Sequence, residues 1–188
     1  GNLVTNATWN DFWLNEGFTV YFEQRIMEKL YGENYAEMLT ALGLGELKNT
    51  INSMGEKDPD THLYLNLENR DPDDGVSDIA YEKGRFFLRT IEAAVGREEF
   101  DKWVNSYFNH FKFKSVTTSE FISYLNDHLI KGNVELEQKI RMNDWIFGPG
   151  LPDNCPQIIS KEFEKTDSQS QAFINGKSAS ELNTKDWT

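Results

Sequence analysis

Glu16 is the residue of this sequence that most clearly calls for a chemical partner. If residues 6–31 form a helix, Phe12 and Trp13 lie one turn before Glu16 and Val20 lies one turn after it. The same face carries three more apolar residues, Trp9, Met27 and Leu30. A carboxylate buried in such surroundings without a partner costs several kcal/mol. Glu16 must therefore be compensated by another group.

Three kinds of partner are open from the residues alone. One is a metal ion, and another is a basic side chain, for which Lys83 and Arg85 are candidates. The third is water, if the face is less buried than its pattern indicates. Gly17 follows directly and costs a helix about 1 kcal/mol relative to alanine. This indicates a close approach to the backbone, either by another molecule or by a second helix.

The other candidate groups are acidic or phenolic. Glu23 lies two turns after Glu16 on the same predicted helix face. Asp73 belongs to the acidic run DPDD, which on its own reads as a solvated turn. Tyr81 lies on an apolar face of a predicted helix, and its default role is that of a core tyrosine with a hydrogen-bonded hydroxyl.

Several common kinds of site find no support in the sequence. Cys155 is the single cysteine, which argues against a zinc finger and an internal disulfide. The histidines are too far apart to form an H-x-x-H pair: His62, His110 and His128. Neither a phosphate-binding glycine loop nor a G-x-S-x-G turn is present.

The composition describes an acidic globular chain. It has 188 residues, a net charge of −12 and 13% aromatic residues, enough for a packed core. The negative charge argues against nucleic acid and anionic membranes as partners. No apolar run is long enough to span a bilayer, and the first residues do not resemble a signal peptide. The lone cysteine favours a reducing compartment, so we expect a cytoplasmic protein.

The apolar pattern predicts an all-α fold. The helices expected from periodicity and caps cover 6–31, 33–54, 77–95, 98–111, 117–130 and 134–147. A long polar loop with a short extended piece at 62–67 separates the second helix from the third. Residues 153–180 lack a period and are expected to form a linker, and 181–187 are expected to open another helix.

Three motifs resemble one family of enzymes. The segment GNLVTNATWNDFWLNEGFTVYFE, the YEKG at Tyr81–Gly84 and the WIFGPGLP at Trp145–Pro152 are similar to the zinc aminopeptidases related to aminopeptidase N and leukotriene hydrolase. Within that family they are most similar to the leukotriene hydrolase branch. The resemblance covers about residues 1–152 and implies the helical subdomain of a thermolysin-like (gluzincin) catalytic domain. It also implies that residues 153–188 lead toward a further helical domain.

The resemblance assigns a role to each candidate residue. Glu16, within W-L-N-E-G, matches the family's third zinc ligand, and the two histidine ligands and the general base of H-E-x-x-H would lie shortly before Gly1. Tyr81 matches the tyrosine that stabilises the oxyanion of the tetrahedral intermediate. Glu23 is placed to accept a hydrogen bond from a zinc histidine, and Asp73 matches a pocket aspartate used in epoxide hydrolysis.

These roles predict one zinc ion per longer chain, peptides as substrates, and upstream and downstream domains as partners. The isolated chain, with one of three ligands, is expected to bind zinc poorly and to lack peptidase activity. Leukotriene hydrolase has a second tyrosine where this chain has Val76, which favours an aminopeptidase over a bifunctional epoxide hydrolase. A non-catalytic helical interaction module that has lost its zinc site is the other alternative.

Overall fold

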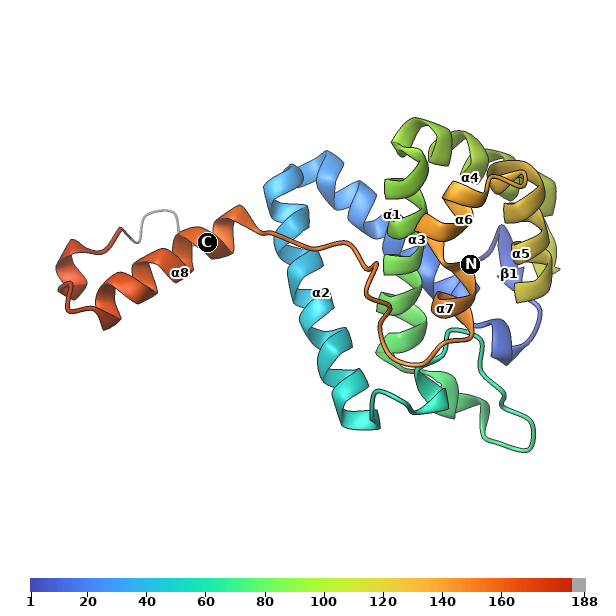
Figure 1. Ribbon diagram of the computed structural model, residues 1–188, viewed down its shortest axis with the longest axis horizontal. Helices are drawn as coiled ribbons and strands as arrows, with labels where there is room; N and C mark the ends of the chain where they lie inside the picture. The colour runs from blue at the N-terminus through green and yellow to red at the C-terminus, as the bar shows by residue number, and fades with distance from the viewer. Residues whose placement is uncertain (184–188) are drawn as a thin grey trace. The chain divides into compact units, whose positions relative to one another are not determined.

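The computed structural model describes residues 1–183, which are mostly helical (Figure 1). The helices are α1 (Trp13–Tyr31), α2 (Glu33–Met54), α3 (Gly84–Val95), α4 (Arg97–Phe111), α5 (Thr118–Leu125), α6 (Val134–Ile140), α7 (Met142–Ile146) and α8 (Lys161–Ile174). The predicted all-α class is confirmed. None of the helices in this part of the chain combines the length and apolar character needed to cross a membrane.

Contacts group the chain into two compact units. The first contains Gly1–Glu23 and Leu44–Pro156, and the second contains Gln24–Gly43 and the chain from Gln157 onward. In the second unit, Gly32 has a φ of +90° and joins α1 to α2, as its position after the first helix predicts. The predicted division into 1–152 and 153–188 stays a prediction.

The core of the first unit is aromatic and is centred on α3, with α4 and α6 packed against it (Figure 1). Its buried aromatic residues come from several helices: Trp13, Phe18, Phe86, Phe87, Phe100, Trp103, Tyr107, Phe121 and Trp145. Phe121 lies edge-on to both Trp13 and Tyr107, with ring centroids 5.1 and 5.8 Å apart. Such contacts hold α1, α4 and α5 around one cluster.

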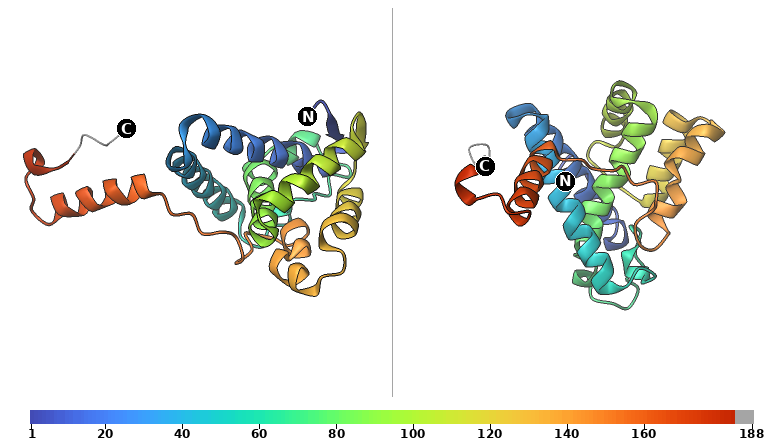
Figure 2. Two further views of the ribbon diagram at one scale, coloured as in Figure 1. Left: turned by 90° about the horizontal axis from the view of Figure 1, so that it is seen from above. Right: turned by 60° about the vertical axis from the view of Figure 1, so that its left-hand side comes forward.

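The start of the chain is tied to the rest of this unit by strands and a buried carboxylate. β1 (Val4–Asn6) lies beside β2 (Lys114–Val116), close to the N-terminus (Figure 2). The two strands pair in parallel, with Val4 opposite Lys114. The buried Asp11 accepts hydrogen bonds from the Thr118 backbone N–H at 2.8 Å and from the Thr8 hydroxyl at 2.7 Å. The single helix predicted from residue 6 is therefore wrong at its beginning. A strand and a 3-10 turn, Trp9–Asp11, precede α1.

The buried face of α1 differs from the predicted aromatic stripe. The buried residues are Trp13, Leu14, Gly17, Phe18 and Tyr21. Within the stripe, Trp9 is 48% exposed and Leu30 66% exposed. The side of the helix that carries Glu16 is therefore partly open to solvent, so water, the third kind of partner, has access to this carboxylate.

Gly17 is a point of backbone contact between α1 and the start of α3. A Cβ atom placed on Gly17 would lie 2.9 Å from the backbone of Gly84, and one placed on Gly84 would lie 2.9 Å from Cα of Gly17. Two glycines are needed here because any side chain would push the two backbones apart. Of the two explanations for Gly17, the structure supports packing against a second helix.

A π-helical turn, Ile79–Lys83, leads into α3 and carries Tyr81. Its last residue, Lys83, is fully buried, and the amine donates hydrogen bonds to the carbonyls of Thr61 at 2.7 Å and Gly148 at 2.9 Å. Arg85 is also buried and pairs with Glu82. Neither cation forms an ion pair with Glu16, so the proposal of a basic partner from this segment is wrong.

Two other expectations differ from the structure. The last predicted helix is split at Arg141, which has a φ of +53° and ends α6 before α7 begins. The polar stretch expected to be a linker contains α8, whose first turn is capped by Ser160 through the Phe163 backbone N–H at 3.3 Å. None of the residues of α8 is buried. A helix without a buried face needs no periodic apolar residues, so the sequence pattern does not predict it. The predicted helix at 181–187 lies mostly outside the described residues.

The contact between the two glycines gives a first prediction. Gly17→Ala should lower the free energy of unfolding, because an overpacking cost of about 1–3 kcal/mol exceeds the gain of about 1 kcal/mol in helix propensity. Gly45→Ala is the matched control, since Gly45 also lies in a helix and a Cβ there meets nothing within 4 Å. Urea unfolding should show it stabilised by about 0.5–1 kcal/mol. Equal effects of the two changes would contradict the close contact.

Lys83 gives a second prediction, on the pH dependence of stability. Burial lowers the pKa of its amine from 10.5 to about 7, so between these values the unfolded chain binds the proton and the folded chain does not. The contribution of Lys83 to the free energy of unfolding therefore rises with pH across this window and is flat below it. We expect urea unfolding between about pH 7 and 9 to show that the free energy of unfolding rises more steeply with pH in the wild type than in Lys83→Met. The difference between the two slopes should be at most about 1.4 kcal/mol per pH unit. Parallel pH profiles would show that the amine is not desolvated.

Candidate functional site

Glu16 lies in the first turn of α1 with its side chain half-buried. Its carboxylate makes no hydrogen bond or ion pair with the residues described, 1–183. Burial raises the pKa of Glu16, and the positive charge of the Gly1 amine opposes this effect. An anion that is partly removed from water and has no fixed donor remains available to a cation.

The beginning of the chain lies near this carboxylate. Burial lowers the pKa of the Gly1 amine, and the charge of Glu16 partly offsets the shift. The amine donates hydrogen bonds to the Val4 carbonyl at 3.0 Å and to Asn15 Oδ1 at 3.1 Å. Asn15 Oδ1 also accepts the backbone N–H of Asn6 at 3.0 Å. The segment before β1 is thus held beside the first turn of α1.

Tyr81 is the second group of the site. Its ring is half-buried and packs edge-on against Phe12 of the turn before α1, with centroids 5.9 Å apart and planes at 82°. Its hydroxyl finds no hydrogen-bond partner in the described part of the chain, which differs from the default expectation. Burial raises the pKa of Tyr81, and the negative charge of Glu16 raises it further. The structure therefore brings Glu16 and Tyr81 within electrostatic range of each other.

The two weaker candidates are exposed. Glu23 lies on α1 with its side chain in solvent. Asp73 lies in the 3-10 turn Pro72–Gly75, also exposed, where its backbone N–H donates to Asp71 Oδ1 at 3.0 Å. This turn contacts the Trp9–Asp11 turn. The charge that acts on Tyr81 is that of Glu16. Of the four predicted site residues, the structure therefore brings Glu16 and Tyr81 together.

Within residues 1–183 the site supplies one candidate ligand for a zinc ion. Carboxylate oxygens are zinc ligands, and Glu16 is the half-buried carboxylate that lacks a partner. Over residues 1–183, however, no group of three or more His, Cys, Asp or Glu side chains could hold a metal. His110 and His128 instead pack against the ring of Tyr124, with centroids 5.1 and 4.1 Å away. A complete zinc site would need ligands from beyond these residues.

Two residues shape the site in ways that the sequence analysis does not predict. Gly84 belongs to the YEKG segment and meets Gly17 directly, and Lys83 anchors the turn that carries Tyr81. A signal for Gly84 was present, because a glycine at the start of an apolar helix needs a packing reason. The sequence offers Lys83 as a partner for Glu16, but nothing in it indicates the bonds to two distant carbonyls, since a lysine is normally exposed.

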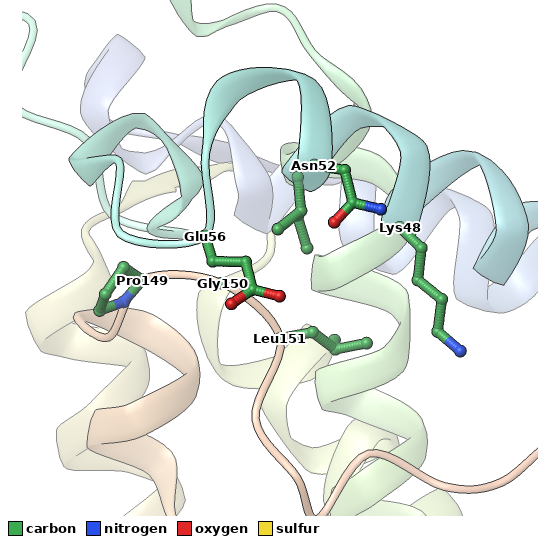
Figure 3. A pocket seen from close by; sticks show the side chains of 7 residues that line it. Lys48, Asn52, Glu56, Pro149, Gly150 and Leu151 are labelled. Atoms are coloured by element: carbon green, nitrogen blue, oxygen red, sulfur yellow. The ribbon is translucent and has the colours of Figure 1, made fainter.

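A cavity of about 410 Å³ lies elsewhere in the first unit, between the end of α2 and the turn after α7 (Figure 3). It is lined by Lys48, Ile51, Asn52, Glu56, Pro149, Gly150 and Leu151. Figure 3 shows the Lys48 side chain extending away from the Glu56 carboxylate. The cavity contains neither Glu16 nor Tyr81, so we do not assign the chemistry to it.

Known proteins similar to this chain include aminopeptidases and leukotriene hydrolases. Leucine aminopeptidase 2 of Lodderomyces elongisporus is 39% identical over 180 residues, covering 84% of this chain and 28% of that protein. A leukotriene A-4 hydrolase homolog of Botryotinia fuckeliana is 34% identical over 194 residues, covering 97% of this chain and 30% of that protein. The chain thus spans less than a third of the length of these relatives.

The fold matches a solved structure over almost its whole length. Native leukotriene A4 hydrolase from Saccharomyces cerevisiae superposes with a TM-score of 0.87 and 33% identity, covering 99% of this chain and 31% of that one. The peptidase family M1 domain matches residues 1–145. This agrees with the resemblance carried by W-L-N-E-G and YEKG. The chain therefore belongs to the peptidase M1 family.

Proposed function

We propose that this chain forms part of a zinc-dependent aminopeptidase that removes N-terminal residues from peptides. In this proposal Glu16 is the third zinc ligand and Tyr81 stabilises the oxyanion. The observation that carries it is the convergence of a half-buried carboxylate and a phenol hydroxyl, neither of which has a hydrogen-bond partner within residues 1–183. Membership of the M1 family and the names of the similar proteins support the same reaction.

Glu16 suits the role of a ligand because its charge is uncompensated. Two neutral histidines together with one glutamate are an established zinc-binding set. Residues that precede Gly1 in a longer protein would enter the site beside Glu16, because the nitrogen of Gly1 lies 3.1 Å from the side chain of Asn15, the residue before Glu16. Zinc, when bound there, would polarise a peptide carbonyl and activate a water molecule.

Tyr81 suits the role of a hydrogen-bond donor because its hydroxyl stays protonated. Its raised pKa keeps the proton on the oxygen near neutral pH. The edge-on contact with Phe12 restricts the ring, so the hydroxyl needs little reorganisation to meet a developing negative charge. A free hydroxyl is required here, since one already bonded to the protein would have to break that bond first.

The remaining candidates have supporting roles in this proposal. Glu23 would accept a hydrogen bond from a zinc-bound histidine, and Asp73 would line the substrate pocket. Val76, 48% exposed, ends the turn that carries Asp73 and has no hydroxyl. We therefore favour peptide hydrolysis over the additional hydrolysis of an epoxide. The unpaired Glu16 and Tyr81 argue against an interaction module, which would have no need of either.

The two site residues should fail in different ways in the longer protein. Glu16→Gln keeps the shape of the side chain but removes the anionic ligand, so purified protein should contain well below one zinc per chain by elemental analysis. Tyr81→Phe removes only the hydroxyl, so zinc should be retained while kcat for an aminoacyl anilide falls by about 10²–10³-fold. Each variant is the control for the other. Normal zinc content in Glu16→Gln, or full activity in Tyr81→Phe, would contradict the assigned roles.

The chain by itself should be inactive. It supplies one ligand of the proposed three, so calorimetric titration of the 188-residue polypeptide with zinc should show only weak binding. Hydrolysis of an aminoacyl anilide should stay at the background rate. Hydrolysis that is abolished by a chelator would show that the polypeptide holds a complete site.

A further inference from the structure

Lys83 is a fully buried cation-forming group that the proposed reaction does not use. Its amine contacts two carbonyls from separate parts of the chain, Thr61 at 2.7 Å and Gly148 at 2.9 Å. Burial is the cause of its lowered pKa, and no acidic side chain counteracts it. Lys83 is therefore held by backbone dipoles and not by an ion pair.

The two carbonyls belong to segments that are hydrogen-bonded to each other through Thr61, and we call Asp58, Thr61, Gly148 and Gly150 together the cradle. The Thr61 hydroxyl accepts the Gly150 backbone N–H at 2.7 Å and donates to the Asp58 carbonyl at 2.6 Å. Thr61 has no exposed surface. The loop before α3 and the turn after α7 thus form one hydrogen-bonded unit around the amine of Lys83.

This cradle acts on the segment that carries Tyr81. Lys83 is the last residue of the π-helical turn Ile79–Lys83, two residues after Tyr81, and the next residue is Gly84, which meets Gly17. A π-helical turn is less stable than regular α-helix and needs tertiary contacts to hold it. The side chain of Lys83 and the backbone of Gly84 supply such contacts at adjacent positions.

We propose that Lys83 is a positioning residue for the reaction: by anchoring the π-helical turn to the carbonyls of Thr61 and Gly148, it holds the Tyr81 hydroxyl facing Glu16. The inference rests on the proposed function, since it explains how that site keeps its geometry. Lys83 does not touch the reacting groups, and its effect on the rate passes through Tyr81. An error of about 1 Å in the placement of such a group can lower a rate about a hundredfold.

A double-mutant cycle in the longer, zinc-loaded protein tests this. Lys83→Met removes the donors at similar size and should lower kcat about ten- to a hundredfold, with KM and zinc content unchanged. In a Tyr81→Phe background the same change should cost less than about twofold, because the group it positions is gone. Thr61→Val removes the hydroxyl that bonds Gly150 but keeps the Lys83 amine. It should also lower kcat more in the wild type than in Tyr81→Phe, by a smaller factor than Lys83→Met. Thr90→Val is the control, since it removes a buried hydroxyl on α3 that donates to the Phe86 carbonyl of its own helix, and it should leave kcat unchanged.

A second measurement does not depend on activity. Hydrogen exchange followed by mass spectrometry should show faster exchange over residues 79–84 in Lys83→Met and not in Thr90→Val. Losses of rate that are equal with and without the Tyr81 hydroxyl, or unchanged exchange at 79–84, would overturn the inference. A wild-type protein without peptidase activity would instead refute the proposed function, and the exchange result would then decide whether Lys83 holds the turn.

Discussion

Where α1 meets the start of α3, the backbones of Gly17 and Gly84 touch with no space for a side chain on either. Each glycine adjoins the segment that carries a site residue, since Glu16 precedes Gly17 and Tyr81 lies three residues before Gly84. The contact therefore brings these two segments side by side. The aromatic cluster holds the helices together, and at this contact the charge of Glu16 acts on Tyr81.

Within residues 1–183 the charge of Glu16 is not compensated by an ion pair. Burial raises the pKa of both Glu16 and Tyr81, and the negative charge of Glu16 adds to the shift at Tyr81. Elsewhere in the first unit the buried charged groups are paired: Asp11 with backbone and hydroxyl donors, Arg85 with Glu82, and Lys83 with two carbonyls. The buried indole N–H of Trp103 has no partner within residues 1–183, but it lies in the aromatic cluster and carries no charge. The open carboxylate of Glu16 beside the open phenol of Tyr81 is what a place for a metal ion and a substrate requires.

How far the sequence predicts this structure depends on where each element obtains its stability. Helix α4 is predictable because its buried apolar residues recur with the helical period on the face that meets the aromatic core. Helix α8 is not, because it buries no residues and depends on a cap and on side-chain pairs such as Lys165–Glu162. The break at Arg141 is also hidden, since a left-handed arginine follows from tertiary contacts and not from local preference. At the site, the motifs identify Glu16 and Tyr81, but no sequence pattern predicts that Gly17 and Gly84 meet and bring them together.

The most direct test of the account is the position of zinc in a crystal structure of the longer protein, located from its anomalous scattering. The account predicts the ion at about 2.0–2.2 Å from a carboxylate oxygen of Glu16, with the Tyr81 hydroxyl facing its open side and the Gly17–Gly84 contact preserved. Zinc bound elsewhere, or Glu16 turned away from the ion with another residue in its place, would contradict it.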